Sequence, residues 1–148
     1  MKSIVQKEIL FDDEYLTLYY DPSNSCIIKE WKQTVPVNKF RGLIVELLMK
    51  IVEARTKYKK PVNLIADCRK LGGDTFTPEV IDWLNTEVHR LYAMNKITKK
   101  AFVASQDITA NLSIVNYIST SNNLSDFTMN IFDDIEGAKD WVVEHEVA

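Results

Sequence analysis

The clearest periodic pattern in the chain runs from Val37 to Tyr58. Apolar residues recur in it at steps of four and three, at Phe40, Ile44, Leu47, Ile51, Ala54 and Tyr58. This spacing places them on one face of a helix, so we predict a helix over the whole segment. Further apolar residues widen that face: Leu43, Val45, Leu48, Met49 and Val52. They leave only a narrow polar stripe on the helix. Either the sheet and a neighbouring helix or a second subunit is expected to cover so wide an apolar surface.

Short segments rich in β-branched and aromatic residues precede and follow this helix. EYLTLYYD (14–21) and CIIKEWK (26–32) are separated by the turn-forming DPSNS and are predicted to form a hairpin. SIVQKEILF (3–11) could add a further strand at the edge. VNLIADC (62–68), KKAFVAS (99–105) and DFTMNIFD (126–133) are short apolar runs of the kind found in strands buried on both faces.

Three more helices are predicted, one after each of these apolar runs. The first runs from Pro78 to about Met94, with Ile81, Leu84, Val88, Leu91 and Tyr92 facing the core. The second is TANLSIVNYISTS (109–121), with Leu112, Val115 and Ile118 facing inward. The last is DIEGAKDWVVEHEV (134–147), with Asp133 as N-cap, Glu136 three residues on, and a shared face of Ala138, Trp141 and Val142.

The alternation of helix and strand after the hairpin defines the expected fold. Connections of this length suit right-handed crossovers between parallel strands. We therefore predict one α/β domain over residues 1–148. Its single mixed sheet begins with an antiparallel hairpin, continues in parallel βαβ units, and packs with about four helices.

Composition narrows the function classes. The 148-residue chain is 46% hydrophobic and 26% charged, which is typical of a globular domain. Its net charge of −3 gives no general attraction to phosphate backbones, so nucleic acid is not expected as a partner. The sequence shows neither a long uncharged apolar stretch nor a signal-peptide pattern, so we expect a cytoplasmic protein that is not an integral membrane protein. Cys26 and Cys68 lack zinc or redox spacing and are expected to be buried thiols.

Several strand and helix segments together carry a resemblance to a known family. They are LTLYYD, the tryptophan-bearing CIIKEWK, NLIADCR followed by TPEV and DWL, KKAFVAS, and the ending NIFDDIEGAKDWV. In this combination the chain resembles the SpoIIAA-like proteins of the STAS and lipid-binding Sec14-type superfamily over nearly its whole length. The ending is the most specific part, with an aromatic residue and an acid before a short acidic turn, Ala138 and Trp141.

The resemblance implies a β/α superhelix with a role in regulation or ligand binding. The family's anti-sigma-factor antagonists switch by phosphorylation of a serine in an Asp-Ser-Ser-Gly-type turn between a strand and a helix. The matching loop here reads DCRKLGGDTFTPEV (67–80) and has no serine: Cys68 follows Asp67, and its only hydroxyls are those of Thr75 and Thr77. If a phosphorylation switch is retained, Thr75 is the expected acceptor, because Thr77 should be occupied as a helix cap.

The residues of this loop form the candidate regulatory site. Thr77 before Pro78 has the pattern of an N-cap followed by proline at the first helical position. Gly72 and Gly73 are expected to supply turn geometry with positive φ. Asp67 ends a parallel strand, at the edge where open α/β sheets bind ligands, or else it accepts hydrogen bonds from its own turn. The loop that leads from Cys68 to the cap is longer than most such connections, which favours a function.

The sequence favours binding over catalysis. His89 and His145 lie in no recognisable nucleophile or metal pattern, so no catalytic residue, cofactor or metal is expected. A nucleophilic pair of Cys68 and His89 stays open from sequence alone, with iodoacetamide reactivity as its test.

Two surface features favour a protein partner or self-association as a homodimer. Trp83 lies off the core stripe of its helix, so we expect it to be partly exposed, either as an interface anchor or packed over a loop. RTKYKK (55–60) and KITKK (96–100) both precede central strands, so their lysines should lie at the sheet edge opposite Asp67. They either complement helix ends or dock an acidic partner or an anionic membrane surface. A non-catalytic regulatory or protein-interaction domain therefore ranks first, and a pocket for a small apolar or lipid ligand second.

Overall fold

One six-stranded sheet forms the centre of the molecule, and its strands lie side by side in chain order. The computed structural model describes residues 7–122 and 127–143. Strands β1 (Glu8–Asp12), β2 (Leu16–Asp21) and β3 (Cys26–Trp31) are antiparallel neighbours. Strands β4 (Asn63–Asp67), β5 (Lys99–Val103) and β6 (Thr128–Phe132) continue parallel to β3. The predicted mixed sheet is confirmed, including a strand at its N-terminal edge.

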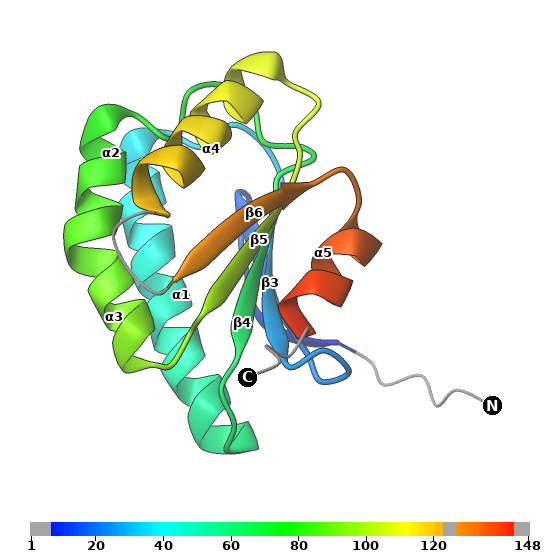
Figure 1. Ribbon diagram of the computed structural model, residues 1–148. Coiled ribbons are helices and arrows are strands. Elements are labelled where there is room, and N and C mark those ends of the chain that lie inside the picture. The colour runs from blue at the N-terminus through cyan, green and yellow to red at the C-terminus, as the bar shows by residue number, and fades with distance from the viewer. Residues whose placement is uncertain (1–6, 123–126, 144–148) are drawn as a thin grey trace.

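The helices lie on the two faces of this sheet in unequal numbers (Figure 1). One face carries α1 (Val37–Tyr58), then a continuous helix, and then α4 (Ile108–Ser121). The continuous helix consists of α2 (Pro78–Trp83), the π-helical turn η1 (Leu84–Val88) and α3 (His89–Met94). The other face carries α5 (Ile135–Val143). Because the parallel strands are added in sequence with one hand of crossover, the connecting helices all fall on the same face.

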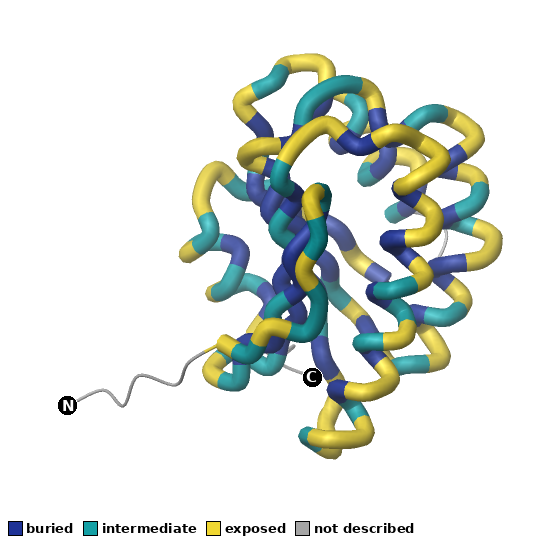
Figure 2. Tube along the Cα trace, turned by 180° about the vertical axis from the view of Figure 1, so that it is seen from behind, coloured by how far each residue is buried: buried dark blue, intermediate teal, exposed yellow. Residues whose placement is uncertain are grey.

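Apolar residues of both sheet faces are buried beneath these helices. The larger core lies under α1 to α4, where strand residues such as Leu18, Trp31, Leu64 and Phe102 belong to the same cluster as Ile44 of α1. The smaller core, under α5, contains Cys26, Ile28, Ile65, Ala101, Val103, Ala138 and Val142. Figure 2 shows the consequence, with buried residues along the strands and exposed residues on the outer sides of the helices.

Helix α1 matches its predicted bounds but is not covered all round. Phe40, Ile44, Leu47, Ile51 and Ala54 are buried, as the spacing predicts. Its outward side exposes a line of apolar side chains within this single chain: Val45, Met49 and Val52. The wide apolar arc therefore packs against the rest of the chain along one side only.

The predicted inward face of α4 is wrong for Leu112 and Val115, although Ile118 does pack against the larger core. Leu112 is 67% exposed and Val115 is 49% exposed. The buried residues are instead Ala110, Ile114, Tyr117 and Ser121. This helix carries apolar residues on two faces. Tyr117 favours the inner face, because its ring stacks on Phe76 with 5.1 Å between the ring centroids.

The start of the last helix also needs a correction. Helix α5 begins at Ile135, and Asp134 Oδ1 accepts a hydrogen bond from Gly137 N at 2.7 Å, so Asp134 is the cap in place of Asp133. Ala138 and Val142 are buried and Trp141 packs against the same core, as predicted. His145 lies outside the described residues.

Candidate functional site

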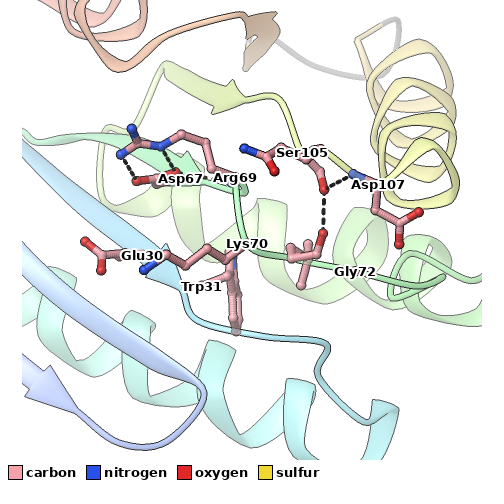
Figure 3. Close-up of a pocket in the computed structure, with 10 residues that line it drawn as sticks. Glu30, Trp31, Asp67, Arg69, Lys70, Gly72, Ser105 and Asp107 are labelled. Atoms are coloured by element: carbon pink, nitrogen blue, oxygen red, sulfur yellow. Dashed lines mark hydrogen bonds and ion pairs between the residues drawn. The ribbon is translucent and has the colours of Figure 1, made fainter.

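A cleft opens at the carboxyl ends of β3, β4 and β5 (Figure 3). We call "the cleft" the hollow of about 810 Å³ that is lined by Glu30, Trp31, Asp67, Arg69, Lys70, Leu71, Gly72, Ser105, Gln106 and Asp107. Its size is that of a ligand pocket, and it lies at the edge where open α/β sheets bind ligands. The loops after β4 and β5 supply most of its wall.

Asp67 ends β4 at the cleft, and it is buried. Its Oδ1 accepts hydrogen bonds from the Arg69 backbone N at 3.2 Å and from Arg69 Nε at 2.9 Å. Its Oδ2 accepts from Arg69 Nη2 at 2.7 Å. Asp67 thus binds its own turn, one of the two roles expected from sequence. The Arg69 guanidinium adds a bidentate ion pair, drawn with dashed lines in Figure 3.

Asp107 ties the loop after β4 to the start of α4. Its Oδ1 accepts from Thr109 N at 3.0 Å, as the N-cap of α4, and its Oδ2 accepts from Gly73 N at 2.7 Å. Gly73 has a φ of +75°, so the predicted positive φ holds there. The prediction of positive φ is wrong for Gly72. Glycine fits this position because a Cβ atom would lie only 2.7 Å from Thr34 Oγ1.

The Ser105 side chain links the loop after β4 to the loop after β5. Its buried hydroxyl donates to Leu71 O at 2.5 Å and accepts from Asp107 N at 2.9 Å. Asn111 holds the same residue by its backbone, with Nδ2 donating to Ser105 O at 2.6 Å. Ser105 and Asp107 follow β5 directly, so the rule that adjacent parallel strands end at one edge could have identified them from sequence.

The two threonines of the loop have different surroundings. Thr77 caps α2 as predicted, with its hydroxyl accepting from Val80 N at 3.3 Å and Pro78 in the first turn. Thr75 is only 2% exposed, and its Oγ1 has no hydrogen-bond partner among the described residues. Its neighbour Phe76 is buried against Tyr117. A kinase could reach Thr75 only if the loop opened, so this geometry does not favour the phosphorylation switch.

Cys68 turns away from the cleft into the larger core. Burial raises the pKa of its thiol to about 12, which opposes formation of the thiolate that a nucleophile requires. His89 is buried as well, and its Nε2 lies 2.5 Å from Tyr117 Oη. Burial is the first cause that lowers the pKa of His89 to about 3, followed by the charges of Lys100 and Lys29. Neither residue has the environment of an activated nucleophile and its base.

Trp83 is half-buried, and Arg41 of α1 lies over its ring with 5.1 Å from Cζ to the centroid. The partial exposure predicted for this residue is therefore present. The ring packs against the larger core on one side and lines a shallow surface hollow with Pro78, Asp82 and Glu87 on the other.

The lysines placed at the opposite sheet edge separate into two groups. Lys59 and Lys60 are exposed before β4, at its amino end, as predicted. The prediction that Lys100 lies at this edge is wrong, because Lys100 is only 1% exposed and lies inside the larger core. It alternates with Lys99 along β5, and one residue of such a pair must point to each face of the sheet.

Lys29 of β3 joins Lys100 in that core, and sequence reasoning missed both. Lys29 is 1% exposed, and from across β4 its charge is one of the causes that lower the pKa of Lys100. None of the ion pairs in the described ranges includes either residue. We call these two residues "the lysine pair". Burial lowers the pKa of Lys29 to about 8 and that of Lys100 well below its ordinary value.

Comparisons with known proteins add no assignment: no protein family, no curated protein and no solved structure matches this chain. Within residues 7–122 and 127–143, no group of three histidine, cysteine or acidic side chains is placed to hold a metal ion. In the same ranges no helix has the length and apolar character needed to cross a membrane.

Proposed function

We propose that this chain is a non-catalytic regulatory or protein-interaction domain of the SpoIIAA-like type, without the usual phosphoserine, and that a partner protein binds at the cleft. As part of the same proposal, the protein works in the cytoplasm, where thiols such as the buried Cys26 and Cys68 stay reduced. The sequential sheet with three connecting helices on one face is compatible with that type of fold.

One observation carries the proposal: Asp67, Asp107 and Ser105, three side chains of the cleft with the usual catalytic chemistry, are already used to hold its walls. Asp67 accepts three hydrogen bonds from Arg69, and Asp107 caps α4 while it holds Gly73. The Ser105 hydroxyl is engaged by Leu71 and Asp107. A general acid or base must be able to reach a substrate proton, whereas these groups are turned toward the protein. The arrangement gives a fixed polar surface, which suits recognition.

Charge at the mouth of the cleft supports a protein partner over a lipid. Glu30, Arg69 and Lys70 line it, and Arg69 and Lys70 are exposed. Mixed charges on rigid loops can be matched by a partner's side chains and set its orientation and association rate. An apolar or lipid ligand would desolvate Glu30 and Lys70 without pairing them, so this second candidate has less support.

Affinity capture from cells of the source organism, followed by quantitative mass spectrometry, tests the proposal. The wild type is compared with Lys70→Glu in the cleft and with Lys60→Glu at the opposite edge of the sheet. We expect at least one protein to be enriched by the wild type and by Lys60→Glu, and to fall at least tenfold with Lys70→Glu. Loss with Lys60→Glu alone would move the partner to the basic edge. Enrichment of no protein by the wild type would contradict the proposal.

Self-association and bound ligands can be measured on the same preparation. Native mass spectrometry distinguishes a dimer from a monomer and shows a ligand that co-purifies. A co-purified lipid would favour the second candidate. The homodimer expected from Trp83 stays a prediction, and a monomer by light scattering at high concentration would count against it.

A further inference from the structure

Two lysine side chains lie buried on either side of β4, and no carboxylate of the described residues pairs with them. Lysine is almost never fully buried unless it is paired with an opposite charge. The lysine pair departs from this rule, since Lys29 and Lys100 are each 1% exposed and neither belongs to an ion pair of the described residues. Lys100 Nζ faces aromatic rings, with 4.8 Å to the centroid of Phe102 and 5.3 Å to that of Tyr117. The site therefore holds two amines and lacks the anion that would balance them.

The other titratable groups around the lysine pair cannot supply that anion. They are Cys68 after β4, His89 and Tyr92 of α3, and Tyr117 of α4. Burial raises the pKa of Cys68 to about 12 and raises those of both tyrosines, so all three keep their protons at neutral pH. Neutral His89 is occupied with the Tyr117 hydroxyl. Two ammonium groups in contact here would repel each other, which favours a neutral amine on Lys100.

The strand between the two amines leaves them close to each other. In the parallel register Lys29 is opposite Ala66 of β4, and Lys100 is opposite Leu64. Ala66 contributes only a methyl group between the two long side chains. The π-helical turn η1 immediately precedes His89 in the helix above, and such turns occur frequently at functional positions. Tyr92 Oη and Asn85 Oδ1 of the same helix are buried and lack hydrogen-bond partners among the described residues.

We propose that Lys100 is a carbon dioxide site, which forms a carbamate on its Nζ with Lys29 as the counter-ion. The Lys100 nitrogen lone pair forms a bond to the carbon of CO2, and one C=O π pair moves onto oxygen. The proton lost from the Lys100 nitrogen passes to the Lys29 amine. Two neutral amines and one CO2 thereby become a carbamate and an ammonium, with all atoms conserved and no net change in charge. The product is the buried ion pair that the present side chains lack.

The burial of the site selects this reactant. CO2 is small, uncharged and apolar, so it can enter a closed core through ordinary fluctuations, whereas a carboxylate or a phosphate would have to be desolvated. CO2 reacts with the free amine and not with the ammonium. Exposed lysines with ordinary pKa values are protonated at neutral pH, so they react poorly under the same conditions. This modification goes beyond the proposed partner binding and does not depend on it.

Labelling with 13C bicarbonate in equilibrium with CO2, at about pH 8, tests the proposal on the whole chain. Carbamate is detected by 13C NMR, then trapped as its ethyl ester with triethyloxonium ion and located by peptide mass spectrometry. We expect the ester on Lys100. It should be absent from Lys100→Met and at least tenfold lower in Lys29→Met, where the carbamate would lose its counter-ion. The exposed variant Lys96→Met is the matched control and should keep full labelling at Lys100.

Both core variants are expected to fold, because an apolar side chain of similar length replaces an unpaired buried amine. Circular dichroism checks this before labelling. The α-amino group of the chain, about half of which is unprotonated at about pH 8, is an internal positive control. An esterified α-amino group without an ester on Lys100 in folded wild type would overturn the proposal. Equal labelling of Lys100 in the wild type and in Lys29→Met would overturn the role of Lys29.

Discussion

The cleft and the lysine pair share the strands β3, β4 and β5, but charged groups have opposite surroundings in the two places. At the carboxyl ends of β4 and β5, Asp67 and Asp107 accept hydrogen bonds from the two loops that they hold. Toward the middle of β3 and the start of β5, Lys29 and Lys100 are buried on either side of β4, and Lys100 Nζ faces aromatic rings. Asp67 is buried at the end of the neighbouring strand β4, yet neither lysine belongs to an ion pair of the described residues.

The difference separates two uses of charge in one sheet. At the cleft, the buried charge of Asp67 is balanced by the half-exposed Arg69, and pairs with an exposed member contribute little to stability. In the core, an unpaired amine destabilises the fold unless it becomes neutral. The cleft therefore suits recognition, while the lysine pair makes stability depend on pH and on any anion formed there. Three variants test this contrast.

The largest expected effect comes from acid, through His89 beside the lysine pair. Because the folded pKa of His89 is about 3 and its ordinary value is 6.5, the unfolded chain binds a proton at a higher pH than the folded chain. Stability should be constant above about pH 6.5 for this group and fall by up to about 1.4 kcal/mol per pH unit as the pH drops toward 3. Urea denaturation between pH 7 and pH 4 measures this slope.

The variant His89→Phe isolates that contribution, because it keeps an aromatic ring among Tyr92, Tyr117 and Phe127 but cannot be protonated. Its stability should fall less steeply with acid than that of the wild type, although other groups, such as the carboxylates of Glu8 and Asp12 with lowered pKa values, still add some slope. Parallel curves for the two proteins would show that His89 is not a buried neutral imidazole.

The second effect is a gain in stability from removal of the lysine pair. Replacing buried charged groups by apolar side chains of similar size is often stabilising by about 1–4 kcal/mol, so Lys29→Met with Lys100→Met should raise the free energy of unfolding at pH 7. The pKa of Lys29 is about 8 in the folded chain and 10.5 ordinarily. Between these two pH values Lys29 is therefore protonated in the unfolded chain and mostly neutral in the folded chain. The advantage of the double variant should therefore shrink as the pH rises through that window.

Urea denaturation of the two proteins at pH 7 and pH 9 measures the change. The comparison between proteins is needed because the buried thiols, with raised pKa values, lower the stability of both at high pH. Lys59→Met on the exposed edge is the control and should change stability little. A double variant clearly less stable than the wild type would mean that the lysine pair has an internal partner.

The contrast also marks what the sequence could predict. Elements with one strong period were predicted correctly, as for the helix from Val37 to Tyr58 and the hairpin around 21–25. The order of parallel strands follows from the crossover rule, and that rule brought Asp67 to a ligand-binding edge. Helix α4 failed because two of its faces carry apolar residues, so periodicity could not choose between them.

Within the site, we predicted the roles of residues with a local sequence pattern, but not the contacts between residues far apart in the chain. Thr77 and Gly73 are recognisable from their own neighbours, and they have the predicted roles. Asp107 lies 34 residues from Gly73, so its bond to that loop depends on where two strands end. Lys100 was assigned to the surface because lysine usually is, although its place in an apolar run was a signal for burial. For Gly72 we predicted a positive φ, whereas the observed reason for glycine is its close approach to Thr34.

The smallest expected effect is at the cleft itself, where Arg69→Gln removes the charged half of the pair with Asp67. The Arg69 side chain is 52% exposed, and its backbone N still donates to Asp67 Oδ1 in the variant. The loss of stability should be about 1 kcal/mol or less, and it should diminish as NaCl is raised, because exposed pairs are screened by salt. Urea denaturation in low and high salt measures both quantities. A larger loss of stability that salt does not change would mean that Asp67 is a buried charge that depends on one partner. The distinction between a recognition cleft and a charged core would then no longer hold.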